Sequence, residues 1–346
     1  MINVKKHGKI LSKTILGFED EGVLNPAVIR NIDGIHLFYR AVGKGNFSSI
    51  GYCKLKDPLT VDFRSDIPLI FPQYEYETHG VEDPRIVLID GIYYLTYTAY
   101  DGVNALGALA TSFDLNTFEK KGIVVPQIPY DEFKRLAACQ GAINEKYSRF
   151  NDRNHFLTNP DKSIWVWDKN VIFFPRRIQG NLYFLHRIKP DIQLVCIPDL
   201  NALTKPFWDN YLLHLSEHIL LEPRYQHEVS YIGGGCPPIE TSEGWLMIYH
   251  GVHDTTKGYV YSACACLLDI DNPKVEIARL PYPLFVPDQE WELKGEVNNV
   301  CFPTGALVVE GIVYIYYGAA DERIAVASCN LDDLLVELLT HKIQPQ

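Results

Sequence analysis

Residues 80–102 read GVEDPRIVLIDGIYYLTYTAYDG. Two runs of alternating apolar residues flank the pair Asp90-Gly91, which is a strong signal for a tight β-hairpin turn. Asp83 and Pro84 stand where the first of the two strands begins. The pattern therefore predicts a carboxylate at a strand end, a place where catalytic groups are often mounted.

The same phrase, a polar residue and a glycine followed by alternating apolar and aromatic residues, occurs five times. Its glycines are Gly34, Gly91, Gly180, Gly244 and Gly311. Each repeat offers three or four short strands, too few to bury both faces of a sheet, so neighbouring repeats must pack on one another. The pattern predicts an all-β fold, a five-bladed β-propeller. A pair of β-sandwiches is the competing architecture, but it would not explain a fivefold phrase.

Composition and charge narrow the class of protein. The 346 residues are 47% hydrophobic and 22% charged, and 21 Tyr and 16 Phe against 2 Met favour strands over helices. A formal net charge of −11 argues against a broad surface for nucleic acid or anionic membrane. The sequence has no run of 18 or more apolar residues, so no transmembrane helix is expected.

The eight cysteines do not follow a metal-binding pattern. They form no C-x-x-C pair and no His/Cys cluster with zinc spacing, so no metal is expected. Cys264 and Cys266 alternate within an apolar run and are predicted to be buried strand thiols. Reduced structural thiols favour a cytoplasmic location.

The chain is predicted to form one domain over residues 1–346, because no linker or low-complexity segment divides it. A stretch around 131–168 is richer in charge and Asn, and we expect an insertion over one face of the propeller, with a short helix near 131–139. Leucines at helical spacing after position 330 predict a short closing helix.

In a propeller the entry ends of the innermost strands surround a central tunnel. Aligning the repeats on their prolines places Asp83 there as the only carboxylate among five equivalent positions: Asn25, Asp83, Phe174, Pro237 and Phe302. Carboxylates, guanidinium groups and aromatic rings around one pocket suit a sugar, because its hydroxyls take bidentate hydrogen bonds and its C–H faces pack on rings. The candidate substrate-binding residues are Arg40, Arg85, Tyr97, Asp101, His186, Arg187, Tyr249, His250 and Asp321.

Five phrases together resemble glycoside hydrolase family 130. They are GVEDPRI, YYLTYTAYDG, the YRA of residues 39–41, the GGGCPPI–EGW–YHGV block and the YYGAAD of residues 316–321. The family contains β-mannoside phosphorylases and β-mannosidases, and the resemblance runs over essentially the whole chain. It implies a five-bladed β-propeller, which agrees with the repeat count.

The resemblance implies that Asp83 is the general acid of an inverting reaction, with its proton relayed through the sugar's own 3-hydroxyl. Inversion requires a nucleophile on the opposite face of the sugar. A water nucleophile needs a second carboxylate, for which Glu228 is the candidate, ahead of Glu75, Glu77 and Glu296. A phosphate nucleophile needs basic residues instead, and these would come from Arg176, Arg177, Arg187 and His250.

Residues 103–108 lack the arginine that phosphorolytic relatives often carry after TAYDG. The sequence therefore favours an inverting hydrolase of β-linked mannosides, with β-1,2-mannooligosaccharides among its substrates. The alternative is a β-mannoside phosphorylase that uses inorganic phosphate as co-substrate and releases α-mannose 1-phosphate. A non-catalytic carbohydrate-binding propeller and a retaining glycosidase are further alternatives.

No cofactor is expected for these reactions. The predicted partner is a carbohydrate, with neither nucleic acid nor membrane, and association into a homo-oligomer stays open.

Overall fold

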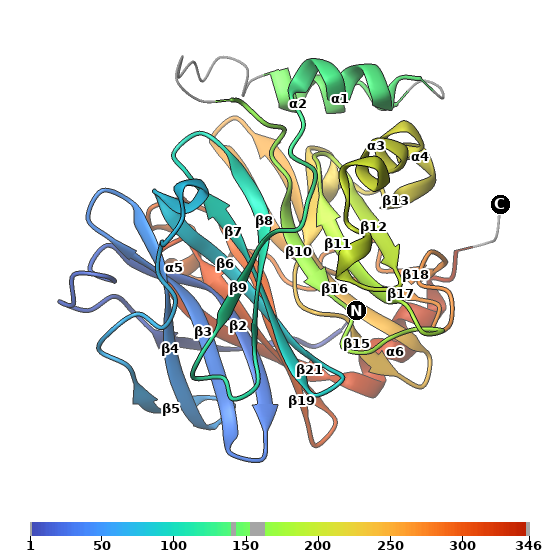
Figure 1. Cartoon of the computed structure of the whole chain (residues 1–346). Helices are drawn as coiled ribbons and strands as arrows, with labels where there is room; N and C mark the ends of the chain where they lie inside the picture. Colours follow the sequence, from blue (N-terminus) through green and yellow to red (C-terminus); the bar gives the residue numbers. More distant parts are fainter. Residues whose placement is uncertain (1, 140–142, 153–162, 344–346) are drawn as a thin grey trace.

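The computed structural model describes residues 2–139, 143–152 and 163–343. Five successive groups of mostly antiparallel strands, called units 1 to 5, make up most of the described chain (Figure 1). Unit 1 contains β2 (Gly22–Asn31), β3 (Gly34–Gly43), β4 (Phe47–Asp57) and β5 (Thr60–Arg64). Unit 2 contains β6 (Gly80–Ile89), β7 (Ile92–Tyr100), β8 (Ala105–Ser112) and β9 (Glu119–Ile123).

The other three units repeat this plan with small variations. Unit 3 contains β10 (Lys169–Phe173), β11 (Leu182–Arg187), β12 (Ile192–Ile197) and β13 (Ile219–Leu221). Unit 4 contains β14 (Tyr231–Gly234), β15 (Ile239–Thr241), β16 (Gly244–Thr255), β17 (Gly258–Leu268) and β18 (Glu276–Arg279). Unit 5 contains β19 (Cys301–Val309), β20 (Ile312–Ala319), β21 (Arg323–Asn330) and the N-terminal strand β1 (Lys5–Leu11), which pairs with β21.

The hairpin turns predicted from the repeated phrase are present in the structure. Asp90 and Gly91 join β6 to β7 and have φ angles of 50° and 78°. Positive φ at both central residues is the mark of the type I′ turn, whose twist matches that of the flanking strands. The glycine of the repeated phrase also has a positive φ in each of the other four units: Gly34, Gly180, Gly244 and Gly311.

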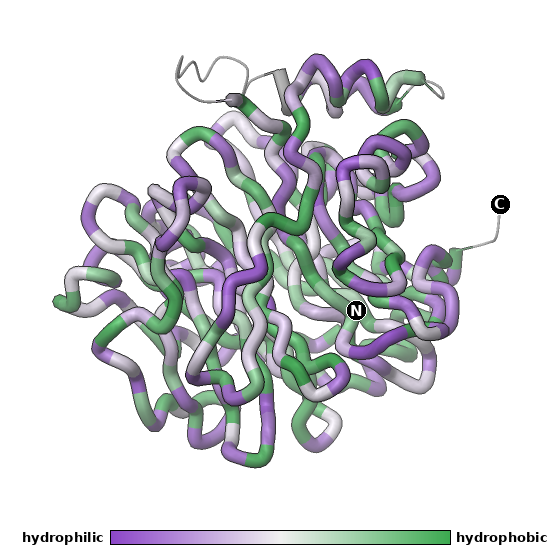
Figure 2. The backbone as a smooth tube through the Cα atoms, viewed as in Figure 1, coloured by the Kyte–Doolittle hydropathy of each residue, from purple (hydrophilic) through white to green (hydrophobic). Residues whose placement is uncertain are grey.

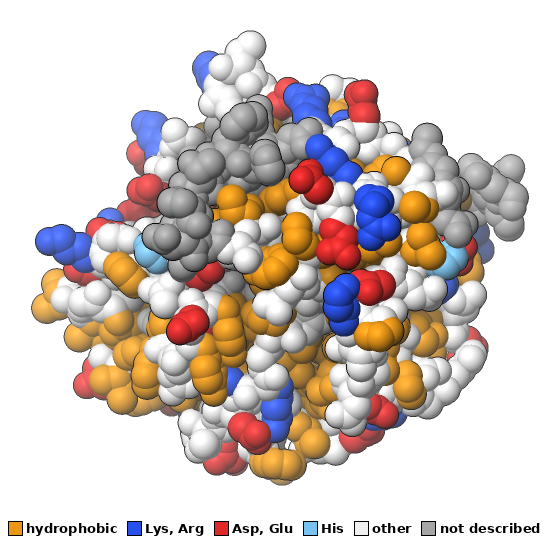
Figure 3. All heavy atoms as spheres, turned by 45° about the horizontal axis from the view of Figure 1, so that its top comes forward, with side chains coloured by type: hydrophobic (Ala, Val, Ile, Leu, Met, Phe, Trp, Pro, Cys, Tyr) orange, Lys and Arg blue, Asp and Glu red, His pale blue; other side chains and the backbone are white. Residues whose placement is uncertain are grey.

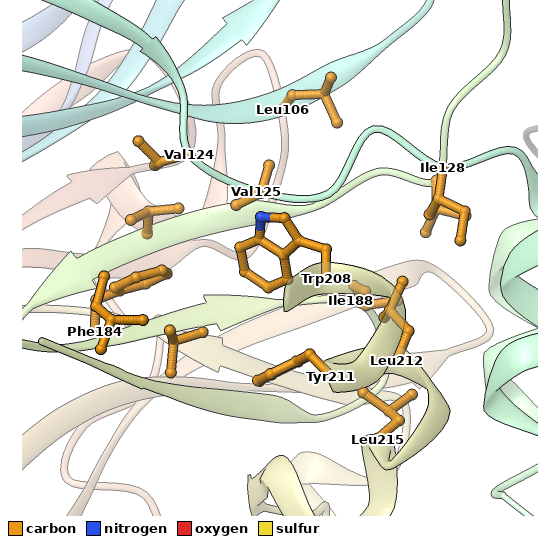
Figure 4. Packing of buried hydrophobic residues seen from close by; sticks show 14 of the residues in the cluster. Leu106, Val124, Val125, Ile128, Phe184, Ile188, Trp208, Tyr211, Leu212 and Leu215 are labelled. Atoms are coloured by element: carbon orange, nitrogen blue, oxygen red, sulfur yellow. The ribbon is translucent and has the colours of Figure 1, made fainter. Parts of the chain in front are cut away.

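Each unit packs its apolar faces on two neighbours. One cluster joins units 2 and 3, where Trp208 lies beside Val125 (Figure 4). Three more clusters join units 1 and 2, units 3 and 4, and units 4 and 5. A fifth joins the last unit to the first, through residues that include Tyr39 and Val326. A pair of sandwiches would not bring unit 5 onto unit 1.

In each unit, a buried acidic residue holds the segment before the innermost strand against other strands of the same unit. In unit 2, the hydroxyl of Tyr97 donates to Glu77 Oε1 at 2.6 Å, and Lys120 of β9 pairs with Glu77 Oε2. The carboxylate also accepts the backbone N–H of Gln73. We call this arrangement the acid–tyrosine–cation triad. It ties the loop before the innermost strand to the second and fourth strands.

The triad recurs in units 1, 4 and 5, whereas unit 3 has a histidine in place of the tyrosine. Its members elsewhere are Glu19, Tyr39 and Arg64; Glu228, Tyr249 and Arg279; and Glu292, Tyr317 and Lys6. In unit 3, His186 Nδ1 donates to the Asp168 carboxylate at 2.8 Å, and its Nε2 lies 2.8 Å from the Tyr211 hydroxyl. Since a buried carboxylate without partners would be costly, these contacts are what allow each acid to be buried.

The helices lie at the periphery of the strands. Helices α1 and α2 lie at the top in Figure 1, and α1 is coloured mainly hydrophilic in Figure 2. The short helix expected near 131–139 is confirmed as α1, and the closing helix is confirmed as α6. The helical bounds are η1 (Glu75–Glu77), α1 (Tyr130–Ala137), α2 (Lys146–Asp152), η3 (Leu200–Ala202), α3 (Lys205–Leu213), α4 (Leu215–His218), η4 (Gln226–Glu228), α5 (Glu290–Leu293) and α6 (Leu331–Thr340).

The expected insertion over 131–168 includes residues 140–142 and 153–162, which lie outside the described residues. The single-domain boundaries stay a prediction. In Figure 3, acidic and basic side chains are interspersed on the face that carries this segment rather than gathered by sign. Among the described residues, no helix is both long and apolar enough to cross a membrane. Cys264 and Cys266 are buried in β17, as predicted.

The triads make a testable prediction about stability. Tyr97→Phe removes one donor to the buried Glu77 carboxylate, and we expect a loss of about 1–3 kcal/mol in the free energy of unfolding. Tyr94→Phe is the matched control, because Tyr94 lies half-buried on the same strand and its hydroxyl makes no hydrogen bond with the described residues. Urea denaturation of both variants gives the comparison. Equal stabilities would contradict a structural role for the triad.

Candidate active site

All five units contribute to one cavity of about 330 Å³. Its size lies at the lower end of the range of ligand pockets, about 300–1,000 Å³. The lining is polar and aromatic, with acidic and basic side chains together. The lining residues are Asn25, Arg40, Asp83, Phe150, Trp167, Lys169, Asn170, Arg187, Lys189, Tyr231, Tyr259, Tyr261, Val300, Phe302 and Asp321.

A β-bulge aims Asp83 at the cavity. The pairing of β6 with β7 shifts between Glu82 and Arg85, and Asp83 adopts a φ of 52°. Asn25 repeats the geometry in β2, with a φ of 50° within a bulge of its own. Asn and Asp are the non-glycine residues that adopt this left-handed conformation most readily. Bulges next to active sites often redirect a side chain in this way.

Positive charge surrounds the Asp83 carboxylate. Asn25 Nδ2 donates to its Oδ1 at 2.7 Å, and an Arg40 nitrogen lies 3.7 Å from the same oxygen. Burial acts to raise the pKa of Asp83, but the charges of Arg40, Lys169 and Arg85 and the hydrogen bond from Asn25 outweigh it and lower the pKa. Asp83 is therefore ionised at neutral pH, and it must gain a proton before it can act as an acid.

Asp321 is the second carboxyl group in the cavity wall. Burial raises its pKa to about 6, with Arg40 opposing the change and the negative charges of Asp83 and Glu82 adding to it. Two neighbouring carboxyl groups that share one set of cations have pKa values that separate in this way. As the pH falls through about 6, Asp321 therefore takes up a proton before Asp83 does.

A basic side of the cavity lies across units 3 and 4. Arg187 is buried, and one of its guanidinium nitrogens lies 3.3 Å from His250 Nε2. Lys189 places its Nζ 3.8 Å from the ring centre of Tyr231. Burial and the charges of Arg187, Arg85 and Lys189 hold the pKa of His250 well below its usual value, so the imidazole is neutral. The cation that contacts His250 is therefore Arg187.

Several polar atoms in and behind the wall have no partner in the described chain. Within the described residues, Arg187 has no carboxylate within ion-pair distance, and its Nε makes no hydrogen bond. Three further buried atoms make no hydrogen bond within the described residues: Asn170 Nδ2, Asn25 Oδ1 and His250 Nδ1. Buried polar groups are normally satisfied, and the donors without a partner at Arg187 Nε and Asn170 Nδ2 would suit a ligand that offers acceptor oxygens.

The structure brings four of the predicted site residues to the cavity: Asp83, Arg40, Arg187 and Asp321. His250 lies directly behind Arg187. Three other candidates, Tyr97, His186 and Tyr249, are fully buried in the triads and do not reach the cavity. The reason is strand alternation: the triad residue and the residue after it point to opposite faces.

Glu228 does not fit the predicted role of water-activating base. It is fully buried, and its carboxylate accepts from the Tyr249 hydroxyl, from Arg279 and from two backbone N–H groups. His227, Glu228 and Cys264 offer atoms close enough to hold a metal ion. However, the Glu228 oxygens are already occupied by donors, one of them a cation, so the group is ill suited to a metal. Glu75 and Glu296 are exposed, and Glu77 belongs to a triad.

Arg85 and Asp101 organise loops instead of lining the cavity. Arg85 is buried and donates to the carbonyl oxygens of Asp83, Pro84 and Gly235, and burial lowers its pKa to about 10. It holds the backbone that carries Asp83. Asp101 accepts from the backbone N–H groups of residues 103 and 104, which closes a turn after β7.

Arg176 and Arg177 do not form the predicted phosphate cradle. Arg176 pairs with Glu240 and Arg177 with Asp90, both at 2.8 Å on the surface near hairpin turns. The lack of an arginine in residues 103–108 is no longer an argument against phosphorolysis, because none of these residues lines the cavity. Gly107 instead packs closely against Val171.

Sequence reasoning missed most of the aromatic and basic lining. Aligning the repeats on proline failed in unit 3, where Phe174 is buried in a core cluster and Asn170 occupies a bulge with a φ of 56°. The Asn25-Pro26 pair, which matches Asp83-Pro84, was a usable signal in unit 1. The residues missed include Lys169, Lys189, Tyr231, Tyr259 and Tyr261.

The profile of glycoside hydrolase family 130, described as beta-1,4-mannooligosaccharide phosphorylase, matches residues 18–340. The curated 1,2-beta-oligomannan phosphorylase of Thermoanaerobacter sp. (strain X514) is 33% identical over 329 residues, which cover 92% of this chain and 93% of the relative. This similarity therefore extends over nearly the full length of both proteins.

Two solved structures share the fold. Beta-1,2-mannobiose phosphorylase from Listeria innocua, in complex with beta-1,2-mannobiose, aligns with a TM-score of 0.74 and 22% identity over 98% of this chain and 100% of its own. The second structure is described under the heading that the GH130 family of mannoside phosphorylases contains glycoside hydrolases that target beta-1,2 mannosidic linkages in Candida mannan. It aligns with a TM-score of 0.72 and 21% identity over 96% of this chain and 94% of its own.

The pKa of Asp321 predicts a pH-dependent difference in stability. Because its folded-state pKa of about 6 lies above the ordinary value of 3.8, the associated stability is present at low pH and is lost as the pH rises through 6. Asp321→Asn does not titrate, so its thermal midpoint should rise relative to wild type between about pH 4 and about pH 7. Asp62→Asn, at an exposed position in β5, is the control. A pH-independent difference for Asp321→Asn would contradict the assignment.

Proposed function

The chain belongs to glycoside hydrolase family 130, and we propose that it is an inverting glycoside phosphorylase that acts on β-linked mannosides. Inorganic phosphate is the co-substrate, and α-mannose 1-phosphate is the product. The observation that carries the proposal is Arg187, a buried guanidinium in the cavity wall with no carboxylate partner in the described chain. A buried cation without a counter-ion is costly, and a phosphate dianion would supply one.

Phosphorolysis replaces the hydrolysis that the sequence favoured. A water nucleophile would need a base across the sugar from the acid. Among the described cavity residues, the carboxylates are Asp83 and Asp321, which share Arg40 and interact with each other. Glu228 is enclosed in its triad. Arg187 and Lys189 of unit 3 also line the cavity, and their positive charges suit an anionic nucleophile.

The chemistry assigned to the residues follows from this division. A phosphate oxygen held by Arg187 and Lys189 attacks the anomeric carbon as the bond to the glycosidic oxygen breaks. Asp83 gives its proton, through the sugar's 3-hydroxyl as in the family mechanism, to the leaving oxygen and ends as a carboxylate. The β-mannosyl group becomes α-mannose 1-phosphate, and the rest of the saccharide leaves with a new hydroxyl.

Bound phosphate would also help Asp83 to gain the proton that it needs as an acid. The pKa of Asp83 is lowered by nearby cations, although burial acts in the other direction. A bound dianion partly cancels the field of those cations and raises the pKa of a neighbouring carboxyl group. Binding of the nucleophile and loading of the acid are therefore coupled.

The preferred linkage is proposed to be β-1,2. The 1,2-beta-oligomannan phosphorylase is 33% identical to this chain, whereas the Beta-1,4-mannooligosaccharide phosphorylase of Ruminococcus albus is 30% identical over a shorter share of it.

The proposed architecture is a five-bladed β-propeller with the cavity at its centre. Three observations support it: five four- or five-stranded units, apolar clusters between every pair of successive units including the last and the first, and a cavity lined by all five. Pairing of β1 with β21 would close the ring, since it joins the two ends of the chain within one blade.

The first prediction of this proposal concerns phosphate itself. With β-1,2-mannobiose as substrate, we expect turnover to rise by orders of magnitude when phosphate is added, and NMR of the early product should show α-mannose 1-phosphate. The phosphate-free reaction is the control. Release of free mannose at an undiminished rate without phosphate would sink the phosphorylase assignment in favour of the hydrolase.

The second prediction separates the two sets of arginines. Arg187→Gln should raise the KM for phosphate by roughly ten- to a hundred-fold, because one charge-assisted hydrogen bond contributes about 1.5–3 kcal/mol. Arg176→Gln is the matched control, since Arg176 pairs with Glu240 on the surface. Asp83→Asn should abolish turnover. Similar phosphate KM values for the two arginine variants would show that Arg187 does not hold the anion.

A further inference from the structure

We propose that four aromatic side chains extend the cavity outward and bind the sugar residues of longer β-mannoside chains beyond the one that is cleaved. The residues are Trp167, Tyr100, His79 and Phe47, and we call them the aromatic track. This inference rests on the proposed function, because it names the part of that substrate which lies outside the cavity.

The rings form a continuous line from the cavity to the surface. Trp167 lines the cavity, and its ring centre lies 6.3 Å from that of Tyr100. The Tyr100 and His79 rings follow at 5.9 Å, and the His79 and Phe47 rings at 5.1 Å. Trp167 and Tyr100 are half-buried, whereas His79 is exposed and Phe47 is 50% exposed.

The outer half of the track is tied to the catalytic side of the cavity. Arg40, which pairs with Glu82 at 2.8 Å, also donates through Nε to Ser48 Oγ at 2.8 Å. The backbone N–H of Ser48 donates to the carbonyl of His79 at 3.2 Å. Phe47 directly precedes Ser48, so the two outer rings are fixed relative to Arg40.

The inner half is held by the turn after β7. Trp167 Nε1 donates to the carbonyl of Val103 at 2.8 Å, and the Tyr100 hydroxyl donates to the carbonyl of Gly102 at 3.0 Å. Asp101 closes this turn by accepting two backbone N–H groups. Asp101 is thus a positioning residue for the track, although sequence reasoning placed it on the substrate.

The chemistry of the track fits a saccharide. A cavity of about 330 Å³ is small for a chain of several sugars, so the rest of a longer substrate must leave through the mouth. Aromatic faces pack on the C–H faces of pyranose rings, and exposed apolar groups that adjoin a binding site indicate contact with a ligand. Because the track is continuous with the cavity, its occupant is the remainder of the same chain.

The test compares substrates of increasing length. With saturating phosphate, kcat/KM of the wild type should rise from β-1,2-mannobiose to β-1,2-mannotetraose. In the Phe47→Ala/His79→Ala double variant, the tetraose-to-biose ratio of kcat/KM should fall by roughly tenfold, the effect of about 1.4 kcal/mol. Phe113→Ala is the matched control, because Phe113 is an exposed aromatic residue in the turn after β8 and should leave the ratio unchanged.

A binding measurement separates failure of the track from failure of the proposed function. Calorimetric titration of the Asp83→Asn variant with mannotetraose, without phosphate, should give a dissociation constant that rises roughly tenfold when Phe47→Ala/His79→Ala is added. This outcome holds whether the reaction is phosphorolysis or hydrolysis. Equal affinity for biose and tetraose, or an unchanged tetraose affinity in the track variant, would overturn the inference.

Discussion

Each unit contains a buried carboxylate whose contacts position the start of its innermost strand. Glu77, Glu228 and their counterparts precede the innermost strand of a unit. In four units the carboxylate accepts from a tyrosine hydroxyl of the second strand and pairs with a cation of the last strand, and in unit 3 His186 contacts Asp168 instead. A carboxylate is buried at low cost only when all of these partners are in place. The contact therefore fixes the loop, and with it the start of the innermost strand, where the cavity residues stand.

The triads also determine what the second strand presents to the cavity. Because side chains alternate along a strand, a tyrosine directed into the triad forces the next residue toward the opposite face. Arg40 follows Tyr39, and Arg187 follows His186, which takes the tyrosine's place in unit 3. The same structural repeat thus delivers a different polar group from each unit, and a nearly symmetric scaffold carries an asymmetric site.

That asymmetry is one of charge. Burial acts to raise the pKa of both Asp83 and Asp321. The charges of Arg40, Lys169 and Arg85 nevertheless lower the pKa of Asp83, whereas the pKa of Asp321 rises to about 6. Arg187 and Lys189 also line the cavity, and no protein carboxylate lies within ion-pair distance of Arg187 in the described chain. This distribution of charge is what supports the proposal of an anionic co-substrate beside a proton donor.

The sequence by itself determined the repeat, the hairpin turns and the position of Asp83, because Asp90-Gly91 and Asp83-Pro84 act through local backbone preferences. It did not reveal which polar residues are buried. Glu228, Tyr97 and Tyr249 look like site residues in one dimension, and Lys169 or Tyr261 do not. Their partners lie far away in the chain, so the tertiary packing alone selects which groups satisfy one another and which face the cavity. The cavity residues selected in this way are what support the proposal of phosphorolysis.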